Sequence, residues 1–296
     1  MAQCGHQIKM SLSCFGLGLL LLLTAGSGYA RASGAEEQGT KQQATSEQEA
    51  PQQQPAAQGQ EVPQQAAVHG VPGPIRFELT SRMESKYEQI FYETSGHVHR
   101  FLLSGSYAFS NMSVGIDELP IIKVDTTGHP DEGYTLGDVI LRFGYVPYIA
   151  PSGNFGAALV TNLTCPTGGF EKGAGNGRFA LEPRLFLPYK VNQWFTTVPA
   201  MYYMFTLKKE EELAQKVSLL TLRLINIFYP SPNTYLIVEP RYYYDFEGNK
   251  PSGELRFNIG TMITRNTTAF LEYSAGLGVN KLFEAKAACG LRYFFR

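Results

Sequence analysis

The chain has 296 residues, of which 44% are hydrophobic and 12% aromatic, and its 25 basic side chains are balanced by 26 acidic ones. This balance argues against a nucleic-acid binder, because neutralising phosphates requires a basic excess. There is no Gly-X-Y period, no heptad run and, after the first segment, no uninterrupted apolar stretch of about 18 residues, which excludes collagen, coiled coil and helical membrane protein.

Residues 1–32 have the pattern of a secretory signal peptide. Lys9 supplies the positive n-region, an apolar core runs from Cys14 to Ala25, and the small residues Ala30 and Ala32 precede an expected cleavage site. A signal anchor is the alternative, but the apolar core is short and is followed by glycine and serine. We therefore expect the mature chain to leave the cytoplasm.

Residues 33–74 are rich in glutamine and proline and contain no aromatic residue. Such a segment cannot bury enough apolar surface to offset the entropy of ordering it, so we expect a disordered tail that acts as a tether, an occluding segment or a solvated spacer. The folded domain is then expected at residues 75–296. Its only cysteines, Cys165 and Cys289, rule out a disulfide framework.

From Ile75 onward apolar residues recur with a period of two, which indicates strands whose successive side chains point to opposite faces of a sheet. We expect tight turns with positive φ at five asparagines, and longer polar or glycine-rich loops between them; the asparagines are Asn111, Asn154, Asn192, Asn233 and Asn266. Each interval then holds two strands and one long loop. With a first strand near 75–84 and a loop through 85–97, the pattern predicts an all-β, up-and-down antiparallel meander of about 12 strands.

A meander with an even number of strands can hide its edges by closing into a barrel. The polar face is too small to cover the outside of such a barrel, and strands of roughly 9–13 residues suit a tilted bilayer crossing. We therefore expect a transmembrane β-barrel, apolar outside and polar inside, in the outer membrane of a Gram-negative bacterium. The alternative is a large exported β-sandwich with an aromatic core.

Aromatic residues cluster near both ends of the predicted strands, where they would form two interfacial girdles. The group near the tight turns is Phe109, Tyr148, Tyr189, Trp194, Tyr229 and Tyr235, and the group near the long loops is Tyr134, Phe179, Phe205 and Phe246.

Three motifs resemble a known family. The segment 136–139 (Leu-Gly-Asp-Val) opens an alternating strand, 165–168 (Cys-Pro-Thr-Gly) closes the next, and 181–183 (Leu-Glu-Pro) opens the one after. Together they resemble the outer-membrane barrels grouped under the phenol-degradation (MetA-pathway) name, and the resemblance covers about residues 75–296. It implies a channel-like protein linked with hydrophobic or aromatic compounds. The last strand also resembles those read by the barrel-assembly machinery, an expected partner during biogenesis.

With the apolar face outward, charged side chains of both signs fall on the inner face. Their near balance argues against a strongly selective electrostatic filter, and they could either line a polar conduit or pair across strands and fill the barrel. The lumen-facing candidates are Arg142, Glu182, Arg184, Arg223, Glu239, Arg241, Glu254, Arg256, Glu272, Lys286 and Arg292, and the same inner face is expected to hold Arg100, Asp117, Lys123, Asp245 and Glu284.

Twelve strands lie between eight, whose interior is filled, and the sixteen or more of water-filled porins. We therefore predict a narrow or gated channel for small molecules, including hydrophobic or aromatic ones, with outer-membrane lipid and a small solute as partners and no nucleic acid. The alternative is a non-conducting structural or attachment barrel, or an undetected outer-membrane enzyme.

One acidic residue does not fit the predicted outer face. Glu118 falls in phase with the outward residues, and a bulge near Leu119 and Pro120 would turn its side chain inward.

Enzymatic and metal chemistry have little support in the sequence, so we predict no enzyme, no cofactor and no metal site. His97 and His99 share a strand face and could be two metal ligands, but no third ligand at a defined spacing is visible. No serine, histidine and acid arrangement resembles the phospholipase or protease barrels. The glycine-rich segment 173–177 lacks the Gly-Lys-Ser/Thr ending of a phosphate loop.

Overall fold

The computed structural model describes residues 80–92, 96–125 and 133–295. The predicted signal peptide (1–32) and tail (33–74) lie outside the described residues, and their boundaries stay predictions. In the described ranges, no helix has the length and apolar character needed to cross a membrane. The strands are β1 (Arg82–Tyr92), β2 (Gly96–Phe109), β3 (Met112–Asp125), β4 (Thr135–Leu136), β5 (Val139–Ile149), β6 (Gly156–Cys165), β7 (Arg178–Phe186), β8 (Tyr189–Lys190), β9 (Phe195–Lys209), β10 (Ser218–Ser231), β11 (Thr234–Asp245), β12 (Lys250–Met262), β13 (Thr267–Leu277) and β14 (Ala285–Phe294).

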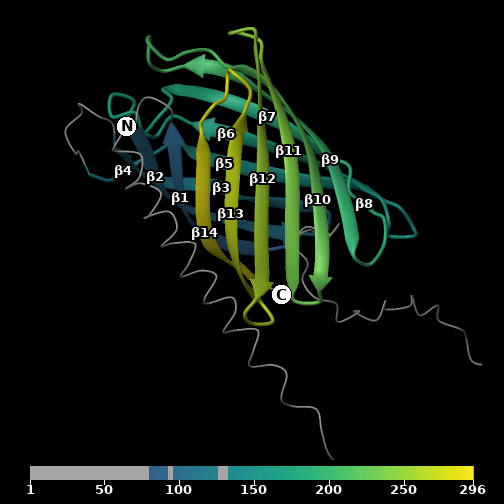
Figure 1. Cartoon of the computed structure of the whole chain (residues 1–296). Coiled ribbons are helices and arrows are strands. Elements are labelled where there is room, and N and C mark those ends of the chain that lie inside the picture. The colour runs from purple at the N-terminus through teal and green to yellow at the C-terminus, as the bar shows by residue number, and fades with distance from the viewer. Residues whose placement is uncertain (1–79, 93–95, 126–132, 296) are drawn as a thin grey trace, which may run out of the picture.

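Twelve long strands close into one antiparallel barrel, while the two-residue strands β4 and β8 extend the pairing of β3 and β9 (Figure 1). Long strands that follow one another in sequence pair with one another, and β1 closes the ring by pairing with β14 in a register that sets Arg82 opposite Phe294. A closed ring leaves no unpaired edge. The predicted up-and-down barrel of about twelve strands is confirmed, and the β-sandwich alternative is wrong.

The first strand does not lie where the sequence predicted it. We expected a strand near 75–84 and a loop through 85–97, whereas β1 spans Arg82–Tyr92. Every second residue from Arg82 to Glu88 is charged, and polar residues such as Ser85 and Gln89 occupy the other face. Because neither face is continuously apolar, the hydrophobic alternation used to find strands is weak here.

The tight turns lie at the predicted asparagines, but without the positive φ that was predicted there. Among the described residues other than glycine, positive φ occurs at Ser110 (53°) and Asn249 (50°), and at none of the five turn asparagines. The Asn111 carbonyl oxygen instead accepts the backbone N–H of Val146 at 2.8 Å. That bond uses a main-chain carbonyl and does not require asparagine, whereas at Asn192 the side-chain Oδ1 accepts the backbone N–H of Trp194 at 2.8 Å within the turn.

The outer surface of the barrel is apolar, as predicted. On β10, Leu222 and Leu224 are each 43% exposed, whereas Thr221 and Ile225 on the opposite face are 5% and 6% exposed. Ring pairs lie on the outer face near the tight turns and near the long loops; they include Tyr107–Phe109, Tyr148–Phe155, Tyr203–Phe205 and Tyr244–Phe246. An apolar belt with aromatic residues toward both ends matches a wall that faces lipid.

Two residues of the predicted girdle near the tight turns, Tyr229 and Tyr235, face the interior instead. Tyr235 is 5% exposed and belongs to an apolar interior cluster with Val198, Ile225 and Ile227, against which Phe186, Tyr229 and Ile237 pack. Successive side chains alternate faces, so Tyr235 cannot share the outward face of its neighbour Leu236. The interior near the turn between β10 and β11 is consequently apolar, whereas Arg82 and Arg292 lie inside the barrel near other tight turns.

Candidate functional site: a charged interior chamber

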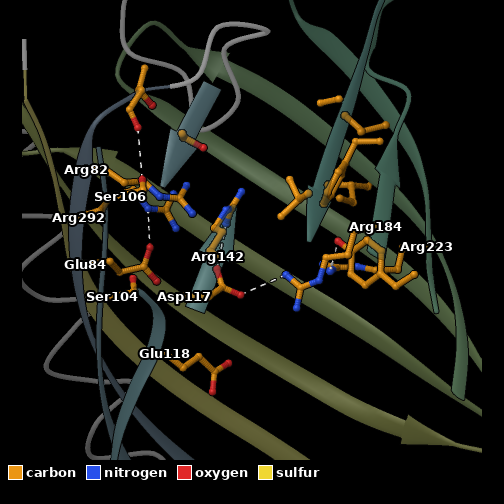
Figure 2. A pocket seen from close by; sticks show the side chains of 18 of the residues that line it. Arg82, Glu84, Ser104, Ser106, Asp117, Glu118, Arg142, Arg184, Arg223 and Arg292 are labelled. Atoms are coloured by element: carbon orange, nitrogen blue, oxygen red, sulfur yellow. Dashed lines mark hydrogen bonds and ion pairs between the residues drawn. The ribbon is translucent and has the colours of Figure 1, made fainter. Parts of the chain in front are cut away.

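The barrel encloses a chamber of about 390 Å³ that is lined from most of its long strands. Figure 2 shows Arg82 and Arg292 on one side of it and Arg184 and Arg223 on the other. Seven lining side chains are basic and four are acidic; they are Arg82, Lys86, Arg142, Arg184, Arg223, Arg256 and Arg292 against Glu84, Asp117, Glu118 and Glu239. The lining itself therefore holds more basic than acidic side chains, while three of its bases also pair with acids just outside it: Arg184 with Glu182, Arg256 with Glu272 and Lys86 with Glu88.

Asp117 on β3 organises one side of the chamber. Its carboxylate accepts hydrogen bonds from Arg142 Nη1 at 3.0 Å, from Arg184 Nη1 at 3.1 Å and from Asn162 Nδ2 at 2.5 Å. Arg184 also binds Glu182, which precedes it by two residues on the same face of β7. These contacts join β3, β5, β6 and β7 through a single carboxylate.

Glu239 on β11 organises the adjoining part of the wall, where Arg223 and Arg184 both lie over the Tyr202 ring. Its side chain is 1% exposed and contacts Arg223, Arg241 at 2.6 Å and Arg256 at 3.3 Å. A buried carboxylate is costly unless it is paired and hydrogen-bonded, and the three guanidinium groups supply that compensation. The arrangement ties β10, β11 and β12 together.

The network continues from Arg241 to Glu254, whose side chain is fully buried. Arg241 Nη1 and Lys286 Nζ lie 3.3 and 3.5 Å from the Glu254 carboxylate, and the Tyr243 hydroxyl donates to it at 2.5 Å. Arg256 on β12 forms a further ion pair with Glu272 on β13. The wall from β10 to β14 is thus cross-linked by ion pairs on its inner face.

Every lumen-facing candidate from the sequence takes part in an ion pair in the structure. They fall into three groups: Arg142, Glu182 and Arg184 around Asp117; Arg223, Glu239, Arg241, Glu254, Arg256, Glu272 and Lys286 in the continuous network; and Arg292 with Glu84. That these residues line a conducting path stays a prediction.

A β-bulge in β3 corrects the prediction for Lys123. The pairing of β3 with β5 shifts between Ile116 and Glu118, and an extra residue inverts the phase of everything after it. Lys123 is therefore in phase with the exposed Ile121 on the outer face, and not in the lumen as predicted. For the same reason Ile122 faces inward and is buried.

The same bulge explains Glu118. The sequence placed this acid among lipid-facing residues unless a bulge near Leu119 and Pro120 re-aimed it. The bulge occurs one to two residues earlier, and it turns Glu118 inward, where its Oε2 lies 2.6 Å from Arg100 Nη2. The re-aiming is confirmed, and the acid is an interior ion-pair partner.

Sequence reasoning missed four interior charges, all on β1: Arg82, Glu84, Lys86 and Glu88. Arg82, Glu84 and Lys86 line the chamber, and Glu88 lies 3.4 Å from Arg100 and 3.6 Å from Lys86. The signal that could have found them is the alternation of charge itself. A period of two in charged residues indicates a strand with a polar inner face as well as an apolar period does.

The glycine-rich loop that follows β6 packs against the segment between β4 and β5 at the long-loop end of the barrel. Asp138, 6% exposed, accepts backbone N–H groups of Gly168 at 3.0 Å and Asn176 at 2.6 Å. A side chain at Gly137 would meet Pro120 and Ala174, whose closest atoms lie 2.8 and 3.0 Å from its Cβ position. Because Pro120 lies on the inner face, the Leu-Gly-Asp motif holds this loop near the inner side of β3.

A closed antiparallel barrel with an apolar outer belt and a charged interior defines the class: the protein is an outer-membrane β-barrel, and its wall is surrounded by membrane lipid. The family follows from the sequence, because residues 85–288 match the model described as putative MetA-pathway of phenol degradation. The chain belongs to that family, and the resemblance inferred from the three motifs is confirmed.

Solved structures share the fold at low sequence identity. An outer membrane channel from Pseudomonas putida F1 is 11% identical, with a TM-score of 0.61, over 75% of this chain and 99% of that one. The NanC porin is 12% identical, with a TM-score of 0.52, over 73% and 100%. The KdgM porin in complex with disordered oligogalacturonate is 14% identical, with a TM-score of 0.50, over 73% and 99%. No curated protein matches the chain.

Proposed function

We propose that the protein is a narrow outer-membrane channel for small organic anions, aromatic carboxylates included. The observation that carries the proposal is the chamber of about 390 Å³ with seven basic and four acidic lining side chains. Guanidinium groups bind carboxylates through paired, charge-assisted hydrogen bonds and stack on aromatic rings. A chamber rich in arginine therefore favours a small, negatively charged aromatic solute over a cation.

The size of the chamber limits the solute. Pockets for small molecules typically measure 300–1,000 Å³, so the chamber of about 390 Å³ suits one small molecule rather than a polymer. Ion pairs on the wall and the loop held by Asp138 restrict the path further. The fold shared with a channel and two porins supports conduction over a catalytic role. Insertion by the barrel-assembly machinery is part of the same proposal.

A non-conducting barrel is the second candidate, and the apolar interior cluster favours it. Val198, Ile225, Ile227 and Tyr235 pack together inside the barrel near the tight turns. Small barrels are filled by their own side chains, and such a barrel would serve for attachment or envelope architecture. The two candidates differ in whether a solute passes this cluster.

Planar-bilayer recording of the purified protein separates them. We expect discrete conductance steps and, in a KCl gradient, a reversal potential that indicates anion preference. Conductance that prefers cations would contradict the anionic solute, and the absence of any step would support the non-conducting barrel.

Arg82→Gln tests whether the chamber sets the preference. Among the described residues no ion pair joins Arg82 to an acid, so the substitution lowers the positive charge without leaving a carboxylate unpaired. We expect it to weaken the anion preference. Lys208→Gln, which removes a lysine whose side chain is 69% exposed on the rim, is the matched control and should leave the preference unchanged.

A further inference from the structure

A polar patch interrupts the outer face of β2 and β3 near their long-loop ends. The antiparallel register pairs His97 with Asp125 and His99 with Lys123. The next pair on the same face, toward the tight turn, is Phe101 with Ile121. Phe101 and Ile121 are 39% and 36% exposed and begin the apolar belt. The patch thus lies on the outward face, at the border between the lipid-facing belt and the loops.

Three potential metal-ligand atoms converge in this patch. His97 Nε2 and His99 Nε2 lie 3.3 and 3.4 Å from the same oxygen, Oδ2 of Asp125, and the three residues offer ligand atoms that all lie within 4.8 Å of one another. Tetrahedral coordination with bonds of about 2.0–2.1 Å separates ligand atoms by about 3.4 Å. Two of the three separations already have this value.

The surrounding side chains orient the ligands. The Tyr87 hydroxyl lies 2.5 Å from His99 Nδ1, which leaves Nε2 directed at Asp125, and such a partner on the second ring nitrogen is typical of metal-binding histidines. Lys123 Nζ lies 3.5 Å from Oδ1 of Asp125 and so leaves Oδ2 for the histidines. The His97 and His99 rings are nearly perpendicular at 82°, with centroids 4.8 Å apart.

We propose that His97, His99 and Asp125 form a binding site for a divalent transition metal of the zinc class, with the remaining coordination position open to water. Two imidazoles and one carboxylate suit Zn²⁺, Cu²⁺ or Ni²⁺, whereas Ca²⁺ and Mg²⁺ prefer a shell of oxygen atoms. The metal bridges β2 and β3 at the ends that carry the long loops, which in outer-membrane barrels is the extracellular side. The site does not depend on whether the barrel conducts.

The simpler interpretation is a cross-strand hydrogen-bond cluster at the rim. It accounts for these contacts, because Nε2–H of each ring can donate to Asp125 and the Tyr87 hydroxyl can donate to Nδ1 of His99. It predicts no affinity for a metal, however, so metal binding distinguishes the two interpretations. The sequence alone showed two ligands because the third comes from the next strand.

Isothermal titration calorimetry of the untagged, metal-free protein with Zn²⁺ in detergent tests the proposal. We expect a tight site of one Zn²⁺ per chain, and no comparable binding of Ca²⁺. Asp125→Asn and the double variant His97→Ala/His99→Ala should each lower affinity by a factor of about 100 or more, and Tyr87→Phe, which touches only the second nitrogen of His99, by roughly 10.

Two control variants separate ligand loss from local disturbance. Gln89→Ala changes the β1 residue opposite His99, and Asp245→Asn removes an acid at the long-loop end of β11; both should bind Zn²⁺ like the unmodified protein. A gel shift on heating verifies folding of each variant. Wild-type protein without the tight site, or ligand variants with unchanged affinity, would overturn the proposal.

Cobalt spectroscopy gives a measurement that needs no variant. Co²⁺ bound to the unmodified protein in a tetrahedral or five-coordinate site absorbs strongly in the visible range, whereas hydrated Co²⁺ absorbs weakly. We expect the strong bands at one equivalent of Co²⁺ and their loss when Zn²⁺ is added. A spectrum that stays that of hydrated Co²⁺ would equally overturn the proposal.

Discussion

Arg292 on β14 donates from Nε to a carboxylate oxygen of Glu84 on β1 at 2.7 Å, although the two residues are 208 positions apart. They are direct partners in the register of β1 with β14, the pair of strands that closes the barrel. Their side chains are 12% and 16% exposed on the inner face. An ion pair therefore reinforces the seam where the first strand meets the last.

Removing one partner of this pair should weaken the closed barrel. We expect Arg292→Ala to lower the free energy of unfolding by about 2–3 kcal/mol, because it leaves Glu84 partly buried without its partner. Urea unfolding in detergent measures the change. Lys208→Ala breaks the pair with Glu210, whose side chains are 69% and 41% exposed, and should cost less than about 0.5 kcal/mol. Equal effects of the two variants would contradict a structural role for the seam pair.

Glu118 offers a test of the bulge in β3. If this acid faced lipid, Glu118→Leu would stabilise the protein; because it faces Arg100 at 2.6 Å, we expect the substitution to cost about 1–3 kcal/mol. The measurement is the urea midpoint in detergent. Ile116→Leu, on the outward face just before the bulge, is the control and should be nearly neutral. A stabilised Glu118→Leu variant would show that the phase of β3 is wrong.

The sidedness of the wall can be tested on β10. Leu224 lies in the middle of the strand and is 43% exposed, so we expect Leu224→Lys to place a charge in lipid at a cost of about 2–4 kcal/mol. Leu213, 85% exposed in the loop between β9 and β10, should tolerate lysine without loss. Unfolding from lipid vesicles gives both values. A tolerated lysine at 224 would mean that this face meets water.

Asp138 should control the order of the glycine-rich loop that follows β6. Asp138→Ala leaves the backbone N–H groups of Gly168 and Asn176 without their acceptor, so we expect faster hydrogen exchange and easier proteolysis across 166–177. We also expect more frequent conductance transitions in bilayers. Asp245→Asn is the control, because Asp245 accepts the backbone N–H of Glu247 in a different loop. It should leave hydrogen exchange across 166–177 unchanged. Unaltered exchange in Asp138→Ala would show that the loop is held by other contacts.

Local pattern was sufficient for the architecture. Strand alternation, such as that around Leu222 and Leu224, and the spacing of the asparagine turns depend on near neighbours in the chain, and they predicted the barrel, its strand number and its apolar outer face. The inner charges from Arg142 to Arg292 follow from the same period. The alternation predicted which charged side chains face the interior, but it did not predict which of them form ion pairs with one another.

Local pattern failed where one residue changes the phase or where polar residues occupy both faces. The bulge before Glu118 moved Lys123 to the outer face, and the polar first strand hid Arg82 and Glu84. Tyr235 was assigned to a girdle although its neighbour Leu236 already held the outward position. For Lys123 the side of the wall depends on pairing with another strand, whereas for Tyr235 the alternation along its own strand already gave the correct face.

The sequence by itself thus determined a membrane barrel with a charged interior, because a two-residue period and turn chemistry are written in adjacent positions. Only the tertiary structure decided which charges meet, such as Arg292 with Glu84, and that Asp125 joins His97 and His99. Those contacts depend on strand register and on closure of the ring, which bring together residues that no spacing along the chain relates.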